Sequence, residues 1–459
     1  MSSNWSRYRL EELGDIVTGK TPPSKVQNAF SDSGTQFVTP RDMDGRRWID
    51  STERFLSESG VAAVKNSLVP SGSVAVSCIG SDMGKAVLLK VESVTNQQIN
   101  TLVVNTQKFN PKFVYYVLST KQDEFKSIAG GSATPILNKG HFGKFEIDLP
   151  TKDEQDFLVR CLDSLDSKIE NNTQINQTLE QIAQAIFKSW FVDFDPVKAK
   201  IEALAAGGSA DDAELAAMSV ISAKTVDELN SLKASNPEAF NKLAQTAALF
   251  PKDLDSETGT PAGWNSGVIA DIAKLNANSW TKKNRPEQVH YVDLSNTKNG
   301  RIETVTTYGF DEAPSRARRI LNSGDTIIGT VRPGNRAFAF IGETEKPLTG
   351  STGFAVLSPK EEFWTSFVYL ATTNDDAIDE YARLADGGAY PAIKPEVVAD
   401  TPCVLPTKDI AQKFWQLTGA MLKKAHQARL ENEELAKLRD TLLPKLLSGE
   451  IDLTSEVTA

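Results

Sequence analysis

Apolar side chains recur at alternating intervals of three and four residues in two long stretches of the chain. This heptad spacing is typical of helices that pack lengthwise against one another. In the stretch 151–200 the seam comprises Leu162, Leu165, Ile169, Asn172, Asn176, Leu179, Ala183, Ile186 and Trp190, with Ile182 beside it. In the stretch 406–459 it comprises Met421, Ala425, Ala428, Asn432, Leu435, Leu442 and Leu446, with Leu438 at the position of Ile182. We therefore predict two long helices.

The simplest partner for either seam is the other, because both stretches lie in one chain and match in length. We expect antiparallel pairing, since each helix begins where a globular region ends, and this would send those regions to opposite ends. About forty helical residues at 1.5 Å each give a rod of roughly 60 Å. The alternative, in which each helix packs only onto its own globular region, stays open. Asn176 and Asn432 either set the register of the pair or lie near a solvated edge.

Two regions outside the helices contain short β-type runs separated by Gly, Pro, Asn and Asp, a pattern typical of strands and turns. These regions are copies of each other. The segment Leu149-Pro150-Thr151-Lys152-Asp153 recurs as Leu405-Pro406-Thr407-Lys408-Asp409, and 68–89 aligns without a gap with 320–341. A period this long indicates a duplicated domain pair. We expect an α/β (α+β) fold of two tandem mixed-sheet domains, separated by the two helices and related by an internal pseudo-two-fold repeat.

The boundaries follow from these patterns. We predict a first domain at 1–150, a first spacer helix at 151–200, a linker at 201–260, a second domain at 261–405, and a second spacer helix with a C-terminal tail at 406–459. The linker is Ala-rich and carries 4 basic against 10 acidic side chains. Asn236-Pro237 is a favourable helix start. We expect two or three short helices there and not a third core domain.

The composition narrows the class of protein. The 459 residues are 40% apolar and 24% charged, as in globular chains of several domains. No apolar run reaches the roughly 18–20 residues of a membrane helix, and the charged N-terminus is followed by no apolar segment, so we expect no signal peptide. Cys78, Cys161 and Cys403 lie far apart, which disfavours a metal cluster or disulfide framework and fits the cytoplasm.

The net charge of −10 does not exclude nucleic acid, because 274–336 contains 11 basic and 6 acidic residues. Basic and amide side chains, which neutralise phosphates and read base edges, gather beside strand-like runs in both domains. In the first domain the predicted DNA-binding residues are Lys20, Thr21, Arg41, Arg46, Arg47, Lys85, Gln97, Gln98, Asn138 and Lys139. In the second they are Lys282, Lys283, Arg285, Arg316, Arg318, Arg332, Asn335, Arg336 and Tyr390. The alternative is an ordinary solvated surface.

The stretch from Gly14 to Thr21 satisfies the phosphate-loop pattern G-x-x-x-x-G-K-[ST]. Its surroundings do not fit, because such a loop lies between a buried strand and a helix. Here a helix-like turn precedes, and Pro22-Pro23 disfavours a helix after it. We find no nucleophile elbow, metalloprotease or kinase motif. We therefore predict no catalytic residue, no metal site and no cofactor, with a self-contained NTPase kept as the alternative.

The order of motifs resembles the specificity subunits of type I restriction–modification systems. The segments that carry the resemblance are 13–22 (LGDIVTGKTP), 95–100 (TNQQIN), 188–196 (KSWFVDFDP), 351–356 (STGFAV) and 438–446 (LRDTLLPKL). They span nearly the whole chain. The second half lacks the Gly-x-Thr-Pro opening, so the contacts of that loop are not carried across, and the linker is longer and richer in Ala than the family leads us to expect.

The resemblance implies two target-recognition domains, each reading one half of a split site in double-stranded DNA. It implies that the helices act as a spacer and dock two methyltransferase subunits, and that nuclease–translocase subunits join for restriction. Adenine methylation and DNA cleavage would belong to those partners, together with S-adenosylmethionine, ATP and Mg. A coiled-coil scaffold without DNA contact is a further alternative.

Overall fold

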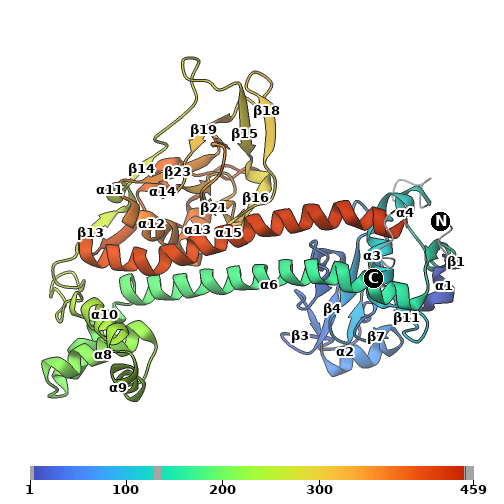
Figure 1. The fold of residues 1–459 in the computed structure, drawn as a ribbon, viewed down its shortest axis with the longest axis horizontal. Coiled ribbons are helices and arrows are strands. Elements are labelled where there is room, and N and C mark those ends of the chain that lie inside the picture. Colours follow the sequence, from blue (N-terminus) through green and yellow to red (C-terminus); the bar gives the residue numbers. More distant parts are fainter. Residues whose placement is uncertain (1–4, 129–135, 449, 451–459) are drawn as a thin grey trace, which may run out of the picture. The chain divides into compact units, whose positions relative to one another are not determined.

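The computed structural model describes residues 5–128, 136–448 and 450, and most of the predicted C-terminal tail lies outside these residues. It divides into two compact units, residues 1–170 with 432–459 and residues 171–431. The two longest helices are α6 (Lys152–Phe191) and α15 (Lys408–Leu447), shown in green and red in Figure 1. Each of them contributes residues to both units, and the units are described separately below.

In the first unit two five-stranded sheets form the first domain. One sheet has the order β2 (Gly14–Thr18), β11 (Ile99–Val104), β8 (Val74–Ser77), β9 (Ala86–Leu89) and β5 (Trp48–Ile49). The other has the order β3 (Phe30–Ser31), β6 (Phe55–Leu56), β4 (Thr35–Val38), β10 (Ser93–Thr95) and β7 (Leu68–Val69). Strands β1 (Ser6–Arg9) and β12 (Glu146–Leu149) pair separately, and the helices are α1 (Leu10–Leu13), α2 (Glu58–Ala63), α3 (Pro111–Ser119), α4 (Gln122–Ile128) and α5 (Lys139–Gly143).

The second unit contains a closely similar domain. One sheet has the order β14 (Ala273–Leu275), β23 (Phe354–Pro359), β20 (Thr326–Gly329) and β21 (Phe338–Phe340), and the other β18 (Thr306–Gly309), β15 (Gln288–Val292), β22 (Leu348–Ser351) and β19 (Ala317–Leu321). Pairs are also formed by β13 (Asn265–Val268) with β24 (Pro402–Leu405) and by β16 (Thr297–Lys298) with β17 (Arg301–Ile302). The helices are α11 (Ile269–Ile272), α12 (Thr365–Thr373), α13 (Asp375–Leu384) and α14 (Pro395–Ala399).

The two domains share one strand order, β2-β11-β8-β9 in the first and β14-β23-β20-β21 in the second. Four pairs of equivalent elements, α1 with α11, β8 with β20, α3 with α12 and α6 with α15, also have equal lengths, although their separation along the chain changes. The separation is 259 residues from α1 to α11, 252 from β8 to β20, 254 from α3 to α12 and 256 from α6 to α15. Insertions and deletions therefore lie between these four pairs of elements. The predicted mixed-sheet fold with an internal repeat is confirmed.

The long helices pair antiparallel within each unit. In the first unit Asp166 of α6 forms an ion pair with Arg439 of α15 at 2.8 Å, and Asn432 donates to the carbonyl of Ile169 at 3.2 Å. Residue numbers thus rise along one helix as they fall along the other. In the second unit Phe187 packs on Phe414, with ring centroids 6.1 Å apart. The predicted antiparallel pairing is confirmed, and packing of each helix on its own domain alone is excluded.

The predicted seam residues differ in burial. Buried seam side chains are Leu162, Asn172, Ala183, Trp190, Ala425 and Leu446. Partly buried ones are Leu165, Ile169, Asn176, Leu179, Ile186, Met421, Ala428, Asn432, Leu435 and Leu442. Ile182 and Leu438, predicted for the interface of the helix pair or of its partners, are 42% and 48% exposed. The contact of Asn432 with the facing backbone favours the register interpretation for that residue.

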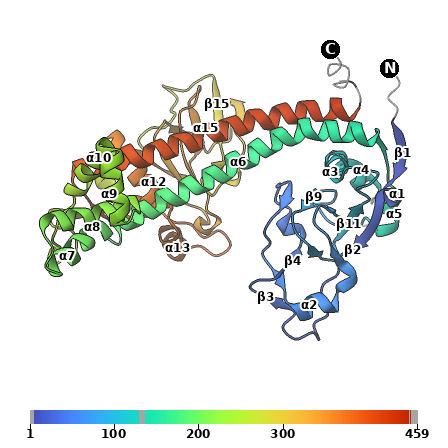
Figure 2. The same cartoon turned by 60° about the horizontal axis from the view of Figure 1, so that its bottom comes forward.

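The predicted first spacer helix, 151–200, ends earlier, at Phe191. Phe194 adopts a left-handed conformation (φ 56°), and a new helix begins at Asp195 with Pro196 in its first turn. That helix, α7 (Asp195–Ala205), is followed by α8 (Ala210–Ser222), α9 (Val226–Ser235) and α10 (Pro237–Ala248). Figure 2 shows these four helices gathered beyond the C-terminal end of α6.

Three of these helices, α8, α9 and α10, lie wholly within the predicted linker 201–260. The segment is also anchored to the second unit. Phe250 packs edge-on against Trp190 of α6 with ring centroids 5.0 Å apart. The ammonium of Lys200, almost fully buried, bonds to Glu214 at 2.8 Å and to the carbonyl of Phe250 at 2.9 Å. The insert belongs to the core of that unit instead of linking two bodies loosely.

Candidate nucleic-acid interface

The phosphate-loop lookalike has a different structure from a phosphate loop. Residues Gly14–Thr18 form β2, which pairs antiparallel with β11. Beyond the strand, Gly19 N–H donates to the carbonyl of Ile99 at 3.0 Å, and Lys20 N–H donates to that of Thr95 at 2.8 Å. These amides are already bonded to the sheet and do not face an anion. The segment is a sheet edge that presents the exposed Lys20 side chain.

Several predicted residues of the first domain gather where β8 and β11 meet. Thr21 Oγ1 donates to Gln97 Oε1 at 2.6 Å. Cys78, directly after β8, joins its backbone to Gln98 on one side and to Leu137 on the other, and the following residue, Asn138, caps α5. The structure thus brings together Lys20, Thr21, Lys85, Gln97, Gln98, Asn138 and Lys139 at one edge, with Lys85 bonded through its backbone to Ser77.

The hydrogen bonds that bring the residues of this edge together do not include Arg41 or Arg46. Arg41 is exposed in the 3₁₀ turn Pro40–Asp42. Arg46 forms ion pairs with Asp44 at 2.9 Å and Asp50 at 2.6 Å. Lys85 is similarly paired with Asp82 at 2.9 Å. Exposed ion pairs of this kind exchange readily with water and with other anions, so Arg46 and Lys85 remain available to phosphate.

The prediction that Arg47 binds DNA is wrong, because its side chain is buried. The guanidinium contacts Asp163 at 2.5 Å, Glu170 at 2.9 Å and the hydroxyl of Tyr116 at 3.0 Å. Burial alone lowers the pKa of Arg47, but Tyr116, Glu170 and Asp166 outweigh it, and the net shift is upward. Arg47 joins the first domain to α6, and its buried side chain has no surface to offer to DNA.

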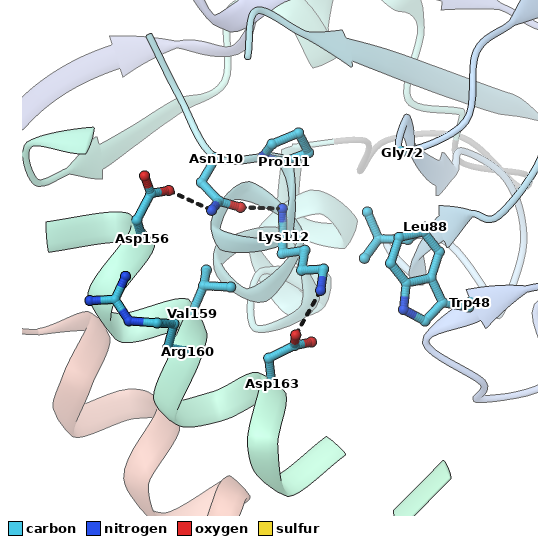
Figure 3. Close-up of a pocket in the computed structure, with 10 residues that line it drawn as sticks. All are labelled: Trp48, Gly72, Leu88, Asn110, Pro111, Lys112, Asp156, Val159, Arg160 and Asp163. Atoms are coloured by element: carbon cyan, nitrogen blue, oxygen red, sulfur yellow. Dashed lines mark hydrogen bonds and ion pairs between the residues drawn. The ribbon is translucent and has the colours of Figure 1, made fainter. Parts of the chain in front are cut away.

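A cavity of about 490 Å³ lies beside this cluster, and Figure 3 shows the ten residues that line it. Lys112 bonds to Asp163 at 2.7 Å, and Asn110 donates to Asp156 at 2.6 Å. Trp48 and Leu88 form the opposite, apolar wall. None of the ten is Ser, Thr, Cys or His, so the lining offers no hydroxyl, thiol or imidazole for covalent catalysis. The polar pairs serve to attach α3 to α6.

In the second domain the loop after β20 occupies the place that the loop after β8 has in the first. Arg332 has a left-handed backbone (φ 49°). Its N–H donates to the carbonyl of Pro391 at 2.7 Å, and Nη2 donates to that of Ala389 at 2.7 Å. The guanidinium lies 4.7 Å from the ring centroid of Tyr390, which is 71% exposed. The structure thus joins two predicted residues into one stacked, outward-facing pair.

The rest of this loop is differently arranged. Arg336 also has a left-handed backbone (φ 58°), but its guanidinium bonds to Asp375 at 2.6 Å and to Asn299 at 3.0 Å. Asn335 is exposed between the two arginines. Arg332 forms no ion pair with any residue that the structure describes, so it is the arginine of this loop most open to an outside anion or base.

A second group of predicted residues surrounds β19. Arg285 pairs with Asp311 at 2.7 Å, and Arg316 pairs with Asp293 at 2.8 Å. Arg318 lies 5.1 Å from the ring centroid of Phe310. The exposed residues Lys282 and Lys283 follow Trp280, whose N–H donates to the carbonyl of Arg318 at 2.8 Å. Arg319 also lies here, within β19 itself.

Two further properties hold for the part of the chain that the structure describes. No cluster of three or more His, Cys, Asp or Glu side chains there is placed to hold a metal ion. Among the same residues, no helix combines the length and the apolar character needed to cross a bilayer.

Comparison with known proteins gives consistent matches. Residues 2–181 match the family model described as the type I restriction modification DNA specificity domain. The type I restriction enzyme HindI specificity subunit of Haemophilus influenzae is 32% identical over 359 residues, covering 74% of this chain and 77% of the relative. The MjaIX specificity subunit of Methanocaldococcus jannaschii is 23% identical, covering 98% and 94%. The crystal structure of the type I restriction-modification S subunit from M. genitalium has the same fold, with a TM-score of 0.54 at 16% identity, covering 97% and 96%.

Proposed function

This chain belongs to the family of type I restriction–modification specificity subunits, and from that premise we propose that its two domains each read one half of a bipartite DNA site. The observation that carries the proposal is the equivalent strand end in the two domains. It presents Lys85 and Gln98 in the first and the Arg332–Tyr390 pair in the second. Equal scaffolds with different side chains suit two different half-sites.

The chemistry of methylation and cleavage belongs, in this proposal, to partner subunits. The chain itself is non-catalytic and binds no cofactor, while S-adenosylmethionine, ATP and Mg act on the partners. Nuclease–translocase subunits join the complex for restriction. The place of action is the cytoplasm, where the DNA is accessible and the thiols of Cys78, Cys161 and Cys403 stay reduced.

Two methyltransferase subunits are proposed to dock on the helices. Ile182 on α6 and Leu438 on α15 occupy equivalent positions of the repeat, 256 residues apart, and each is exposed within its own unit. A large apolar side chain left in water at both equivalent positions suits two copies of one partner. The pseudo-two-fold repeat therefore supports one methyltransferase for each half.

The decisive experiment maps methylated adenines by long-read sequencing in a host that expresses this chain with its methyltransferase. The expected result is one motif of two specified half-sites around an unspecified spacer, absent when this chain is omitted. Methylation that does not depend on this chain would leave only the scaffold alternative. The NTPase alternative is tested separately by calorimetry of ATP with wild type and Lys20→Ala, where micromolar binding lost in the variant would restore it.

A further inference from the structure

Arg319 differs from Arg285 and Arg316, the ion-paired arginines around β19, because no carboxylate of the described chain neutralises it. Its Nη1 donates to Ser279 Oγ at 3.2 Å, and its Nε is buried without a hydrogen-bond acceptor in the described chain. Burial lowers the pKa of the Arg319 guanidinium, and no neighbouring charge acts against this shift. Arg285 and Arg316 nearby both have Asp partners. Arg319 is thus a partly desolvated cation that has no carboxylate partner among the residues that the structure describes.

Such an arrangement costs free energy in the unbound protein. A charge removed from water is stable only when it is paired or fully hydrogen-bonded. Arginine stays protonated at neutral pH even when burial lowers its pKa, so the cost is not relieved by loss of a proton. An anion brought from outside relieves it, and the site therefore favours an anionic ligand.

The backbone around Arg319 leaves room for that ligand. The pairing of β19 with β22 shifts register between Ala317 and Arg319, so Arg318 is an extra residue in a β-bulge. Arg319 then lies opposite Gly350, which has no side chain to cover it. Bulges often re-aim side chains next to functional sites. With Nη1 held by Ser279 and Nε turned into the protein, Nη2 is the edge that an outside acceptor can reach.

The groups next to Arg319 indicate which kind of anion the site would bind. Ser279 Oγ accepts from Arg319, which leaves its own hydroxyl hydrogen to donate outward. The exposed Lys282 and Lys283 belong to the turn that follows Ser279, and the backbone of Ser279 bridges to that of Arg319. Cationic and hydroxyl donors match a phosphate oxygen. With Nε buried and Nη1 bonded to Ser279, Arg319 does not offer the pair of free N–H groups with which arginine reads a guanine.

We propose that Arg319, with Ser279, holds a backbone phosphate of the DNA read by the second domain. The assignment rests on the proposed function of the chain as a DNA specificity subunit. It makes Arg319 a residue that fixes the register of the domain on the duplex without reading sequence. The cation that is uncompensated in the free protein becomes paired only on DNA.

The test compares Arg319→Met with Arg383→Met in the complex with the methyltransferase. Arg383 is an exposed arginine on α13 paired with Glu380 at 2.6 Å, outside the predicted DNA-binding set, so its loss changes the net charge equally. Binding to a duplex that carries the methylation motif is measured over a range of salt concentrations. For Arg319→Met we expect weaker binding on every sequence, a salt slope smaller by about one unit, and an unchanged methylation motif. Arg383→Met should keep the wild-type slope.

Two further measurements separate the possible failures. Arg319→Lys keeps the charge and should keep the wild-type salt slope, and Arg319→Met should melt no lower than wild type, because it removes an unpaired cation. A wild-type slope in Arg319→Met, or a motif relaxed at one base pair, overturns the phosphate assignment alone. Failure of the wild-type complex to prefer any DNA sequence overturns the proposed function instead.

Discussion

Three arginines show how differently one side chain is used in this chain. Arg47 is buried among acidic groups, Arg319 is partly buried without one, and Arg332 is stacked on an exposed ring. Their sequence neighbourhoods look alike, since each lies in a short polar or basic segment beside a strand. The distinction depends on partners such as Asp163, which is 116 residues from Arg47. The local sequence pattern predicted a basic edge in both domains. It could not distinguish exposed arginines from buried ones, which is why Arg47 was wrongly assigned to DNA.

Replacing Arg47 by Met should destabilise the first unit by about 3 kcal/mol, because it removes a buried cation that is bonded at once to Asp163, Glu170 and Tyr116. Thermal and denaturant unfolding measure this loss. The matched variant is Arg46→Met, whose exposed ion pairs with Asp44 and Asp50 should account for no more than about 1 kcal/mol. Equal stability of the two variants would contradict the structural role of Arg47.

The cluster around Arg47 also predicts a response to acid. Burial raises the pKa of Asp163, but hydrogen bonds from Lys112 and Arg47 outweigh it, so the net pKa lies below the ordinary value of 3.8. A lowered carboxyl pKa contributes stability that is complete above the unfolded value and is lost as pH falls through the folded one. Unfolding of wild type should therefore become easier below about pH 4, and Asp163→Asn should reduce that dependence. A variant with the wild-type acid profile would argue against this assignment.

Arg332→Ala should relax the methylation motif in one half-site only, at a cost of about 1–3 kcal/mol if the guanidinium reads a guanine. Arg336→Ala is the matched variant within the same loop. Because Arg336 is bonded to Asp375 and Asn299, its loss should act mainly through loop order and affect sequence preference less. Relaxation of both half-sites by Arg332→Ala would contradict separate reading by the two domains.

Helices were the elements most accurately predicted from the sequence. A heptad pattern is local and long, so α6 and α15 were found with their pairing, whereas the break at Phe194 depends on a single left-handed residue.

The acidity of the insert also has an explanation at the scale of single helices. Ser209 with Asp212 and Thr225 with Glu228 form capping boxes at the starts of α8 and α9. Short helices need such caps, so part of the negative charge serves helix starts.

Thr225→Ala should destabilise α9 by about 1 kcal/mol, because the side chain of Thr225 accepts a hydrogen bond from the N–H of Glu228. Hydrogen exchange of the amides in the first turn of α9 reports this directly. DNA binding and the methylation motif should not change. Thr258, an exposed threonine outside any helix start, serves as the matched position, and Thr258→Ala should leave α9 unaffected.

At the scale of the whole molecule, the duplication predicts how many partners bind. Ile182→Asp and Leu438→Asp each place a charge on one of two equivalent exposed positions, so each should lose one methyltransferase and keep the other. Light scattering after size exclusion should show the complex fall from two methyltransferases per chain to one, while the melting temperature changes little. Leu179→Asp is the contrasting variant, since Leu179 is partly buried and a charge there should lower the melting temperature as well. Loss of both partners from either surface variant would contradict equivalent docking positions.

The loop after β20 has a consequence for how new DNA preferences can arise. Two of its residues, Arg332 and Arg336, hold left-handed backbones with φ of 49° and 58°, a conformation that Asn, Asp and Gly tolerate and β-branched residues resist. Few substitutions at these two positions are therefore compatible with the backbone of the loop, so few can change the DNA sequence that is recognised. A saturation library selected only for retained methylation should be enriched in Asn, Asp and Gly and depleted of Val, Ile and Thr. Asn335 between them, with φ outside that region, should accept a much wider range and is the easier position for evolving a new target.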